Sequence, residues 1–369
     1  MSRLTLVISS LLGGGAERVL TILANGWVNR GTPVTLVTLD DRAPFYALDF
    51  RVARQPLAVA GISANSLAAI WNNLRRVRVL RLAIRASRPD AVVSFGDVTN
   101  VLTLLATRGL GIPVVVSERS DPALCPIGYV FGILRRRLYP RADAVVVQSE
   151  EARRFFSAAI QARTDVIPNP VLPAGALRNQ NAEGDHSRKT VIALGRLSKE
   201  KGFDLLIDAF ARIAPQRPEW SLQIWGEGPD RPLLERMVEE KGLTGRIRLP
   251  GETRSPQEKL LRADLFALSS RFEGFPNALC EAMACGLPVL SVDCPSGPRQ
   301  IVRDGVDGIL VSPEDPNALA HGMRRLMDDA ELRRRLASRA PEVAERFGLD
   351  RVLGLWEAVL ERAPRRRRI

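Results

Sequence analysis

The stretch Ser269–Gly297 has the sequence SSRFEGFPNALCEAMACGLPVLSVDCPSG. It overlaps a short apolar run, Ala263–Ser270, whose length and composition predict a buried parallel strand. After a loop, Pro276 suits the first turn of a helix over Asn277–Cys285, because a missing N–H costs nothing there. A further strand is predicted at Val289–Asp293. The order strand, loop, helix, strand predicts an α/β unit with a loop at the carboxyl end of its first strand.

Two carboxylates mark this unit, Glu273 on the loop and Glu281 inside the helix. The helix amino terminus between them offers free N–H groups and a partial positive charge, which suit a phosphate. Carboxylates accept hydrogen bonds from the vicinal hydroxyls of a sugar or ribose. The unit could therefore hold a sugar–diphosphate–ribose chain. The alternative is two solvated glutamates flanking an ordinary helix.

The spacing of Glu273 and Glu281, with seven residues between them, matches the E-x7-E signature of retaining GT-B glycosyltransferases of family 4. The flanking text EGFPNALCEAMACGLPVL, followed by SGPRQIV, also resembles that family. The resemblance implies two doubly wound, Rossmann-like α/β domains that face each other across a cleft. It implies an enzyme that moves a hexose or N-acetylhexosamine from a nucleotide sugar to an acceptor with retention of anomeric configuration.

The chain length of 369 residues suits two domains. We expect an N-terminal acceptor-binding domain over 1–172, a linker rich in Pro, Asn and Gly over 173–187, and a C-terminal domain that binds the nucleotide sugar over 188–348. The family resemblance implies that a last helix, 349–362, crosses back onto the first domain.

Apolar runs predict a parallel sheet in each half of the chain, with its site at the carboxyl ends of the strands. The strands predicted in the first half are Leu4–Ser10, Val34–Asp40, Ala91–Phe95, Pro113–Ser117, Ala144–Gln148 and Thr164–Ile167. Those predicted before the central unit of the second half are Thr190–Leu194, Ser221–Trp225 and Arg246–Leu249.

The loop Gly195–Gly202, GRLSKEKG, follows a predicted strand and precedes a helix. Arg196 and Lys201 could clamp a diphosphate there, Arg as a bidentate donor and Lys as a point charge. Such a clamp would stabilise charge on a departing nucleoside diphosphate. The alternative is a charged loop with solvated ends. The motif also matches the family, where its Arg and Lys contact the donor phosphates.

The same resemblance assigns residues in three further loops to donor binding. Gly14 and Gly15 lie in GGGAE, the family's first glycine loop, where backbone can approach a ligand closely. Gly226 in WGEGP and Pro250 in LPG would approach the nucleotide base through backbone, with plain turn chemistry as the alternative. The resemblance gives the ribose to Glu281, and the transferred sugar to Glu273 with the backbone of Gly274, Phe275, Pro276 and Asn277.

The segment PVVVSERSDP ends a strand of the first half with Glu118 and Arg119. Many family members have a histidine near this point, whereas His186 and His321 of this chain fall elsewhere. Glu118 could orient the acceptor hydroxyl as a catalytic residue, and Arg119 could meet a phosphate. Either could equally belong to a structural ion pair. No general base is evident, which suits a front-face attack in which the leaving phosphate takes the acceptor's proton.

The net charge of +12 is concentrated in the first half, where residues 1–172 contain 21 Arg, no Lys and 12 acidic residues. A cationic, amphipathic helix predicted at Trp71–Arg88 could lie on anionic lipid. A surface helix packed on the sheet is the alternative. Arg135–Arg137 and Arg365–Arg368 add charge of the same sign. We therefore expect peripheral contact with the cytoplasmic face of the inner membrane.

No cofactor other than the donor is expected. The four cysteines lack CxxC spacing and no D-x-D motif sits in a site loop, so we predict neither a zinc site nor a required metal. Reduced thiols and the absence of a spanning segment or cleavage site predict a cytoplasmic protein.

The pattern SER-DP together with DCPSGPRQIV resembles bacterial members that build lipid-linked oligosaccharides or surface polysaccharides from UDP-sugars. This implies a UDP-sugar donor and an acceptor on a polyprenyl diphosphate.

Three alternatives remain at this point. An NAD-dependent oxidoreductase would use Gly13, Gly15 and Asp40, but Arg18 stands in place of the third glycine. A basic nucleic-acid-binding protein would explain the charge, but aromatic residues make up only 5% of the chain. An inactive scaffold of the same fold would not need Glu273, Glu281, Arg196 and Lys201.

Overall fold

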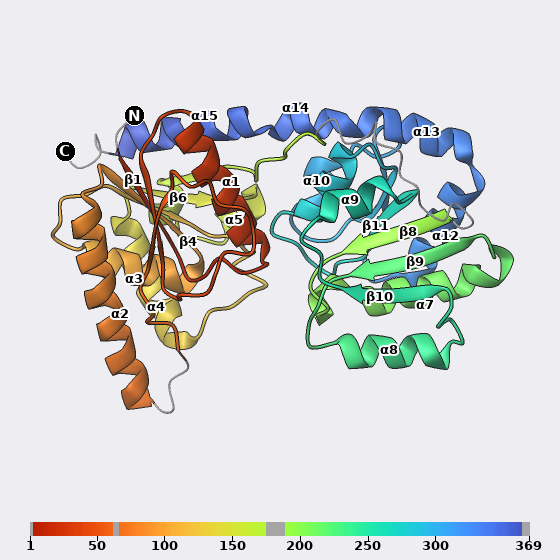
Figure 1. Cartoon of the computed structure of the whole chain (residues 1–369), viewed down its shortest axis with the longest axis horizontal. Helices are drawn as coiled ribbons and strands as arrows, with labels where there is room; N and C mark the ends of the chain where they lie inside the picture. The colour runs from red at the N-terminus through yellow and green to blue at the C-terminus, as the bar shows by residue number, and fades with distance from the viewer. Residues whose placement is uncertain (1–2, 62–65, 175–188, 364–369) are drawn as a thin grey trace. The chain divides into compact units, whose positions relative to one another are not determined.

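The computed structural model describes residues 3–61, 66–174 and 189–363. The chain forms two compact units, each with its own sheet and cores (Figure 1). Unit 1 comprises Met1–Pro170 and Leu349–Ile369, and unit 2 comprises Val171–Gly348. Most of the predicted linker, from residue 175 to 187, and the predicted Arg365–Arg368 cluster lie outside the described residues.

Unit 1 contains a parallel sheet with the strand order β3-β2-β1-β4-β5-β6-β7. Its strands are β1 (Leu4–Ile8), β2 (Val34–Thr38), β3 (Ala53–Pro56), β4 (Ala91–Phe95), β5 (Val114–Ser117), β6 (Ala144–Val147) and β7 (Thr164–Val166). Leu6 of β1 aligns with Leu36 on one side and Val93 on the other. Both faces of these central strands are covered, which explains their continuous apolar sequences.

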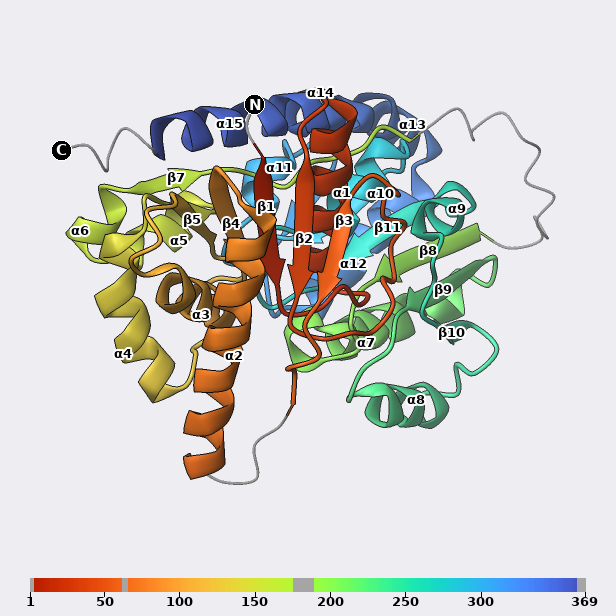
Figure 2. The ribbon, with the colours of Figure 1, turned by 60° about the vertical axis from the view of Figure 1, so that its left-hand side comes forward.

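Helices cover both faces of this sheet. They are α1 (Gly15–Asn29), α2 (Ser66–Ser87), α3 (Asp97–Thr107), α4 (Tyr129–Leu138), α5 (Glu150–Arg154), α6 (Ala158–Gln161) and α15 (Leu349–Arg362), with a 3-10 turn η1 (Tyr139–Arg141). Helices α2, α3 and α4 lie side by side along one face (Figure 2). Helices α1 and α15 pack on the other, where Trp356 stacks on Phe95 at 5.7 Å and meets Trp27 edge-on at 6.2 Å.

Unit 2 contains a second parallel sheet with the order β10-β9-β8-β11-β12-β13. Its strands are β8 (Lys189–Leu194), β9 (Trp220–Trp225), β10 (Ile247–Gly251), β11 (Leu265–Leu268), β12 (Val289–Val292) and β13 (Ile309–Val311). The order reverses between β8 and β11, so the loops that follow these two strands diverge to opposite sides. In doubly wound sheets ligands bind at such a point.

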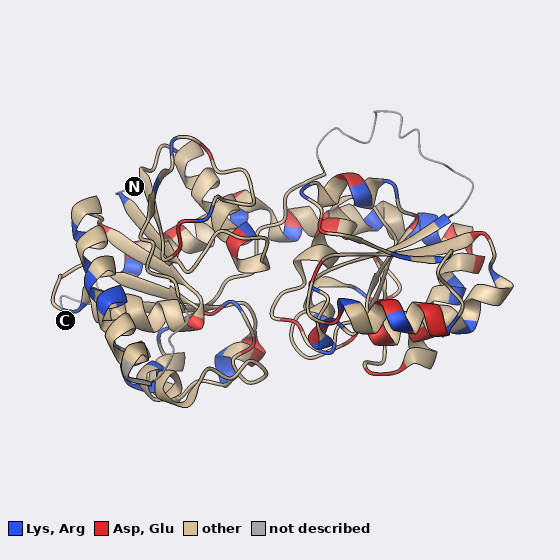
Figure 3. Ribbon diagram, turned by 60° about the horizontal axis from the view of Figure 1, so that its bottom comes forward, with Lys and Arg blue, Asp and Glu red and all other residues tan. Residues whose placement is uncertain are grey.

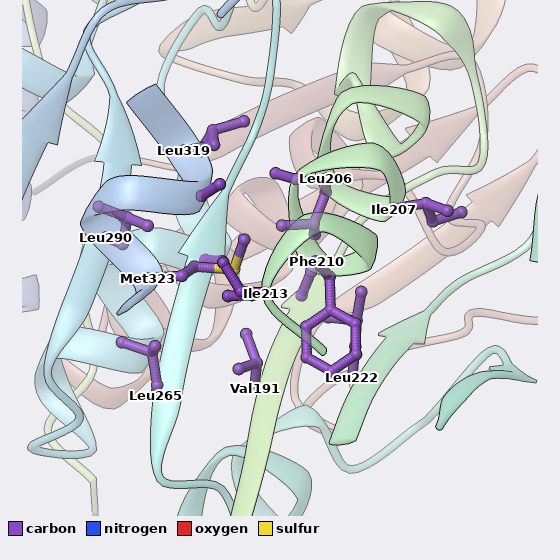
Figure 4. Packing of buried hydrophobic residues seen from close by; sticks show 14 of the residues in the cluster. Val191, Leu206, Ile207, Phe210, Ile213, Leu222, Leu265, Leu290, Leu319 and Met323 are labelled. Carbon is purple, nitrogen blue, oxygen red and sulfur yellow. The ribbon is translucent and has the colours of Figure 1, made fainter. Parts of the chain in front are cut away.

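The helices of unit 2 also cover both faces of its sheet. They are α7 (Phe203–Ile213), α8 (Arg231–Glu240), α9 (Pro256–Leu261), α10 (Asn277–Ala284), α11 (Pro298–Ile301), α12 (Pro316–Asp328), α13 (Ala330–Arg339) and α14 (Val343–Phe347), with 3-10 turns η3 (Lys199–Lys201), η4 (Ala214–Gln216) and η5 (Ala340–Glu342). On one face Phe210 of α7 and Met323 of α12 pack over Val191 and Leu290 (Figure 4). On the other face α10 buries Leu279 and Met283.

Candidate functional site

Three loops at the carboxyl edge of the unit 2 sheet are joined through their backbones. The N–H of Gly195 after β8 donates to the carbonyl of Trp225 at the end of β9, 3.0 Å away. The N–H of Gly226 donates to the carbonyl of Gly251 at 2.9 Å. Gly226 has φ +146°, and a Cβ there would lie 1.9 Å from the carbonyl oxygen of Gly195. Only glycine allows this close approach, which brings the predicted motifs GRLSKEKG, WGEGP and LPG together. Pro250 of the LPG motif is exposed.

The predicted residues Lys201 and Glu273 meet at this edge although 72 positions separate them. Nζ of Lys201 donates to Oε1 and Oε2 of Glu273 at 2.7 and 2.9 Å. The hydroxyl of Ser270 donates to Oε1 at 2.6 Å, and Glu273 is only 7% exposed. A carboxylate so little exposed needs these partners, because an uncompensated buried charge is costly.

The backbone around Lys201 is fixed by the loop that carries Glu273. The hydroxyl of Ser269 donates to the carbonyl of Lys201 at 2.9 Å. Next to it Gly202 has φ +61°, and a Cβ there would lie 2.1 Å from the carbonyl oxygen of Ser269. These contacts hold the end of the GRLSKEKG loop against the end of β11, so the ion pair is a rigid part of the edge.

Arg271, which was not among the predicted site residues, makes a second set of contacts between the same segments. Its guanidinium donates to both carboxylate oxygens of Asp204, at 2.9 and 2.7 Å, and to the carbonyl of Lys199 at 2.7 Å. The only sequence signal was its place in the quoted stretch, two residues before Glu273. Arg271 therefore positions the loop.

Arg196 differs from Lys201 in having an exposed side chain. Within residues 3–61, 66–174 and 189–363, its guanidinium has no hydrogen bond or ion pair. It immediately follows Gly195, in the backbone-joined part of the loop. None of the five N–H donors of this exposed guanidinium is used by a described residue, and they lie at the predicted donor-binding edge.

The amino terminus of α10 completes this edge. Pro276 precedes the helix, and no side chain caps its first turn. Gly297 has φ +118°, and a Cβ there would lie 2.8 Å from Cδ of Pro276, so the loop after β12 packs closely on the helix start. Gly274, Phe275 and Asn277 lie in this segment, and half-buried Glu281 lies one turn into the helix. The helix N-terminus contributes a partial positive charge here.

In unit 1 the predicted glycine loop lies under the side chain of Glu17. A Cβ on Gly14 would lie 2.2 Å from Oε2 of Glu17, and Ser10 donates to Oε1 at 3.2 Å. Burial raises the pKa of Glu17, and the neighbouring carboxylate of Asp40 raises it further. Gly15 begins α1, so both predicted glycines belong to the carboxyl edge of the unit 1 sheet.

Glu118 is 2% exposed and sits in a buried network at the end of β5. The hydroxyl of Tyr139 donates to its Oε1 at 2.5 Å, and Nη1 of Arg135 lies 3.6 Å from the same oxygen. Nδ2 of Asn100 donates to the tyrosine oxygen at 3.0 Å. Burial raises the pKa of Glu118 to about 7, against the lowering effect of Tyr139 and Arg135. The partner of Glu118 is thus Arg135, not its neighbour Arg119.

Arg119 has neutral partners instead. Its Nη1 donates to Oγ of Ser117 at 3.2 Å, and its Nη2 donates to Oδ1 of Asn169. The guanidinium lies 4.5 Å from the ring centre of Phe95. Burial lowers the pKa of Arg119 to about 9. No carboxylate among the residues that the structure describes pairs with it.

Comparison with known protein families identifies the family of this chain. The model described as Glycosyltransferase Family 4 matches residues 13–174, and the model described as Glycosyl transferases group 1 matches residues 177–343. The chain belongs to the family 4 glycosyltransferases. This family membership argues against the two alternatives that the sequence left open, an oxidoreductase and a nucleic-acid-binding protein.

Relatives of this family 4 glycosyltransferase include proteins of different length. Over 317 residues it is 34% identical to an exopolysaccharide phosphotransferase of Streptomyces coelicolor, and the match covers 84% of this chain but 33% of the relative. The chain thus spans about a third of that relative. It is 26% identical to a Campylobacter jejuni GalNAc-alpha-(1->4)-GalNAc-alpha-(1->3)-diNAcBac-PP-undecaprenol alpha-1,4-N-acetyl-D-galactosaminyltransferase, with 96% of this chain and 97% of the relative covered.

The predicted GT-B fold of this glycosyltransferase is confirmed by solved structures. A crystal structure of Anabaena HepE in complex with UDP and glucose superimposes with a TM-score of 0.81 at 21% identity, and covers 98% of this chain and 100% of that one.

Proposed function

We propose that the chain is a retaining glycosyltransferase that moves a hexose or N-acetylhexosamine from a UDP-sugar to a lipid-linked or polysaccharide acceptor in bacterial surface-glycan assembly. The observation that carries this proposal is the edge of the unit 2 sheet where the Lys201–Glu273 pair and exposed Arg196 are held by joined loops. Cations, a helix N-terminus and carboxylates together suit a sugar diphosphate.

The predicted residues of unit 2 then have roles in donor binding. Arg196 and Lys201 bind the diphosphate, and Glu281 binds the ribose. Glu273 and the backbone of residues 274–277 bind the transferred sugar, and the backbones of Gly226 and Pro250 lie against the base. Lys201 has three N–H donors and gives two to Glu273, so one remains for a phosphate oxygen. One lysine thereby links the sugar-binding carboxylate to the leaving group.

The bond-breaking step depends on charge stabilisation at this edge. As the bond between the sugar and the phosphate breaks, negative charge grows on the diphosphate, which Arg196 and Lys201 stabilise without a metal. An oxygen of the leaving phosphate takes the proton of the acceptor hydroxyl on the same face of the sugar. Glu118 is nearly inaccessible and bound to Tyr139 and Arg135. We therefore propose that Glu118 does not touch the acceptor and instead helps to position the end of β5, where Arg119 follows it.

The printed names of related proteins support the substrate classes. The Campylobacter relative acts on a glycan joined to undecaprenol through a diphosphate, and the Streptomyces relative is named for exopolysaccharide. The solved Anabaena HepE contains UDP and glucose. These names favour a UDP-sugar donor and a polyprenyl-diphosphate acceptor for this chain.

Transfer assays with UDP-, GDP- and ADP-sugars and a polyprenyl-diphosphate glycan, with and without EDTA, test the proposal. We expect transfer from a UDP-sugar only, unchanged by EDTA, with the product's anomeric configuration by NMR matching the donor's. Use of a GDP-sugar, loss of activity in EDTA or inversion would each overturn the corresponding part. An inactive scaffold would bind UDP without transferring any sugar.

Peripheral membrane contact is the remaining part of the proposal. Helix α2 exposes Ile70, Trp71 (75% exposed) and Leu74 together with Arg75 and Arg78, and its sequence contains no acidic residue. At the start of α4 on the same face of the sheet, Tyr129 is 82% exposed. Basic residues gather along α2 (Figure 3). Exposed apolar groups beside cations are suited to the headgroup region of an anionic bilayer at its cytoplasmic face.

Among the described residues, no helix is both long and apolar enough to span a bilayer. Sedimentation with phosphatidylglycerol and phosphatidylcholine vesicles therefore tests surface binding. We expect binding to the anionic vesicles, weakened about tenfold by Trp71→Ser with Leu74→Ser. Phe50→Ser removes an exposed aromatic outside α2 and α4 and serves as the control. Equal binding by all variants would contradict this surface.

A further inference from the structure

Arg119 occupies a distinctive place at the carboxyl edge of the unit 1 sheet. Its partners are supplied by neighbouring strands: Phe95 ends β4, Ser117 ends β5, and Asn169 follows β7. Gln148 after β6 donates to the same Asn169 oxygen at 2.9 Å. The guanidinium is thus fixed at the edge of four adjacent strands, where ligands of doubly wound domains bind.

No carboxylate of the described residues compensates the charge of this half-buried guanidinium. Ser117, Asn169 and Phe95 are all neutral, and no ion pair to Arg119 exists within 3–61, 66–174 and 189–363. Glu118, the nearest carboxylate in sequence, is bound to Tyr139 and Arg135. Burying a charge without a partner is costly, and structures generally pair it with an opposite charge.

Arg81 shows what a structural arginine looks like in the same unit. It is also partly buried and lacks a carboxylate partner among the described residues, but its Nη1 donates to the carbonyls of Ala106 and Arg108, at 2.8 and 2.7 Å. These carbonyls lie at the carboxyl end of α3, whose partial negative charge compensates the guanidinium. The described partners of Arg119, which are Ser117, Asn169 and Phe95, include no helix end.

We propose that Arg119 anchors a phosphoryl-binding site at the carboxyl edge of the unit 1 sheet, and that its ligand is the diphosphate of the lipid-linked acceptor. The assignment of the acceptor rests on the function proposed above. Two of the five guanidinium N–H groups are used by Ser117 and Asn169, and Nε is buried without a partner among the described residues. One N–H on each of Nη1 and Nη2 therefore remains for phosphate oxygens. The cation–π contact with Phe95 and the hydrogen bonds to Ser117 and Asn169 restrain the guanidinium, which favours a bidentate contact with phosphate.

Calorimetric titration with inorganic pyrophosphate, in excess UDP to fill the donor edge of unit 2, tests the site directly. We expect binding by the wild-type chain, a loss of about tenfold or more in Arg119→Gln, and a smaller loss in Arg119→Lys, which keeps the charge. Arg81→Gln is the matched control and should bind as the wild type does. Circular dichroism checks that each variant is folded. Unchanged binding by folded Arg119→Gln overturns the site.

Transfer kinetics then test the source of the phosphoryl group. With a diphosphate-linked acceptor, Arg119→Gln should raise the acceptor KM about tenfold while leaving the KM for the donor unchanged. With the same glycan lacking the diphosphate, KM should not change between the variant and the wild type. An equal effect on both acceptors overturns the assignment to the acceptor's diphosphate. If the wild-type chain transfers no sugar, the proposed function and that assignment both fail, whereas the pyrophosphate titration still decides whether the phosphoryl site exists.

Discussion

Lys201 and Glu273 stabilise each other and are both assigned to the donor, so a single substitution changes stability as well as activity. Lys201→Met leaves a nearly buried carboxylate whose remaining side-chain partner, among the described residues, is Ser270. We expect the free energy of unfolding to fall by about 3 kcal/mol, measured by urea denaturation. In the double variant with Glu273→Gln the charge is gone, and much of that loss should be recovered.

Activity separates the two roles of this pair. The double variant should stay inactive in the transfer assay even where its stability approaches that of the wild type, because both proposed donor contacts are missing. Recovery of activity along with stability would show that the pair is only structural.

Glu118 makes stability depend on pH in a way that can be assigned to one residue. Its pKa in the folded chain, about 7, is above the ordinary 4.5, so the folded state holds the proton more tightly than the unfolded state. The resulting stabilisation is fully present below about pH 4.5 and is lost as the pH rises to 7. As the pH rises across this range, the free energy of unfolding should fall by roughly 3 kcal/mol less in Glu118→Gln than in the wild type.

Urea denaturation of both proteins at pH 5 and pH 8 measures this difference. Other titrating groups contribute equally to wild type and variant and cancel in the comparison. A pH dependence identical in the two proteins would mean that Glu118 is ionised throughout.

Residue pairings were the part that the sequence analysis could not supply. Lys201 and Glu273 are each predictable from a motif, but their ion pair depends on β8 and β11 being neighbours in the sheet. The sequence also left open whether Glu118 or Arg119 belongs to an ion pair. Arg135 reaches Glu118 from α4, an element whose position no local pattern fixes. Side-chain partners of this kind follow from tertiary packing alone.

At the scale of elements, the loops after β8 and β9 depend on one glycine. Gly226→Ala would place a Cβ 1.9 Å from the carbonyl of Gly195 at a positive φ, so the two loops have to separate. We expect a loss of about 2–3 kcal/mol in unfolding free energy and weaker UDP binding. Gly245→Ala is the control, because no atom lies within 4 Å of its Cβ position.

Thermal-shift titration with UDP and urea denaturation measure the two effects. Wild-type stability and UDP binding in Gly226→Ala would contradict the required close approach.

Elements with continuous apolar runs were predictable, and an edge strand was not. Strands β4, β5 and β6 are fully buried, and their Val-rich sequences identify them. Strand β3 has the sequence ARQP and lies at the sheet edge, half exposed, so it lacks the apolar signal and was missed. Its pairing is specified by β2, which supplies the backbone partners.

At the scale of the whole molecule, the two units have separate hydrophobic cores, and α15 belongs to the first. Trp356 of α15 is buried against Phe95 and Trp27. Trp356→Ala should therefore destabilise unit 1 by about 3–5 kcal/mol and leave unit 2 unchanged. Leu355→Ala, an exposed position on the same helix, should have little effect.

Differential scanning calorimetry distinguishes the units by their separate transitions. We expect one transition to move to lower temperature in Trp356→Ala while the other stays in place. A single transition that moves as a whole in Trp356→Ala would show that the units unfold together.

The return of the chain to unit 1 also affects the order in which the two units can fold during synthesis. The chain leaves unit 1 at Pro170, completes all of unit 2, and re-enters unit 1 at Leu349. During synthesis on the ribosome, the Trp27 side chain and the α1 face must wait for α15, although they emerge first. Unit 2 can close its core as soon as Gly348 has emerged. The half of the chain translated second can therefore complete its core before the half translated first.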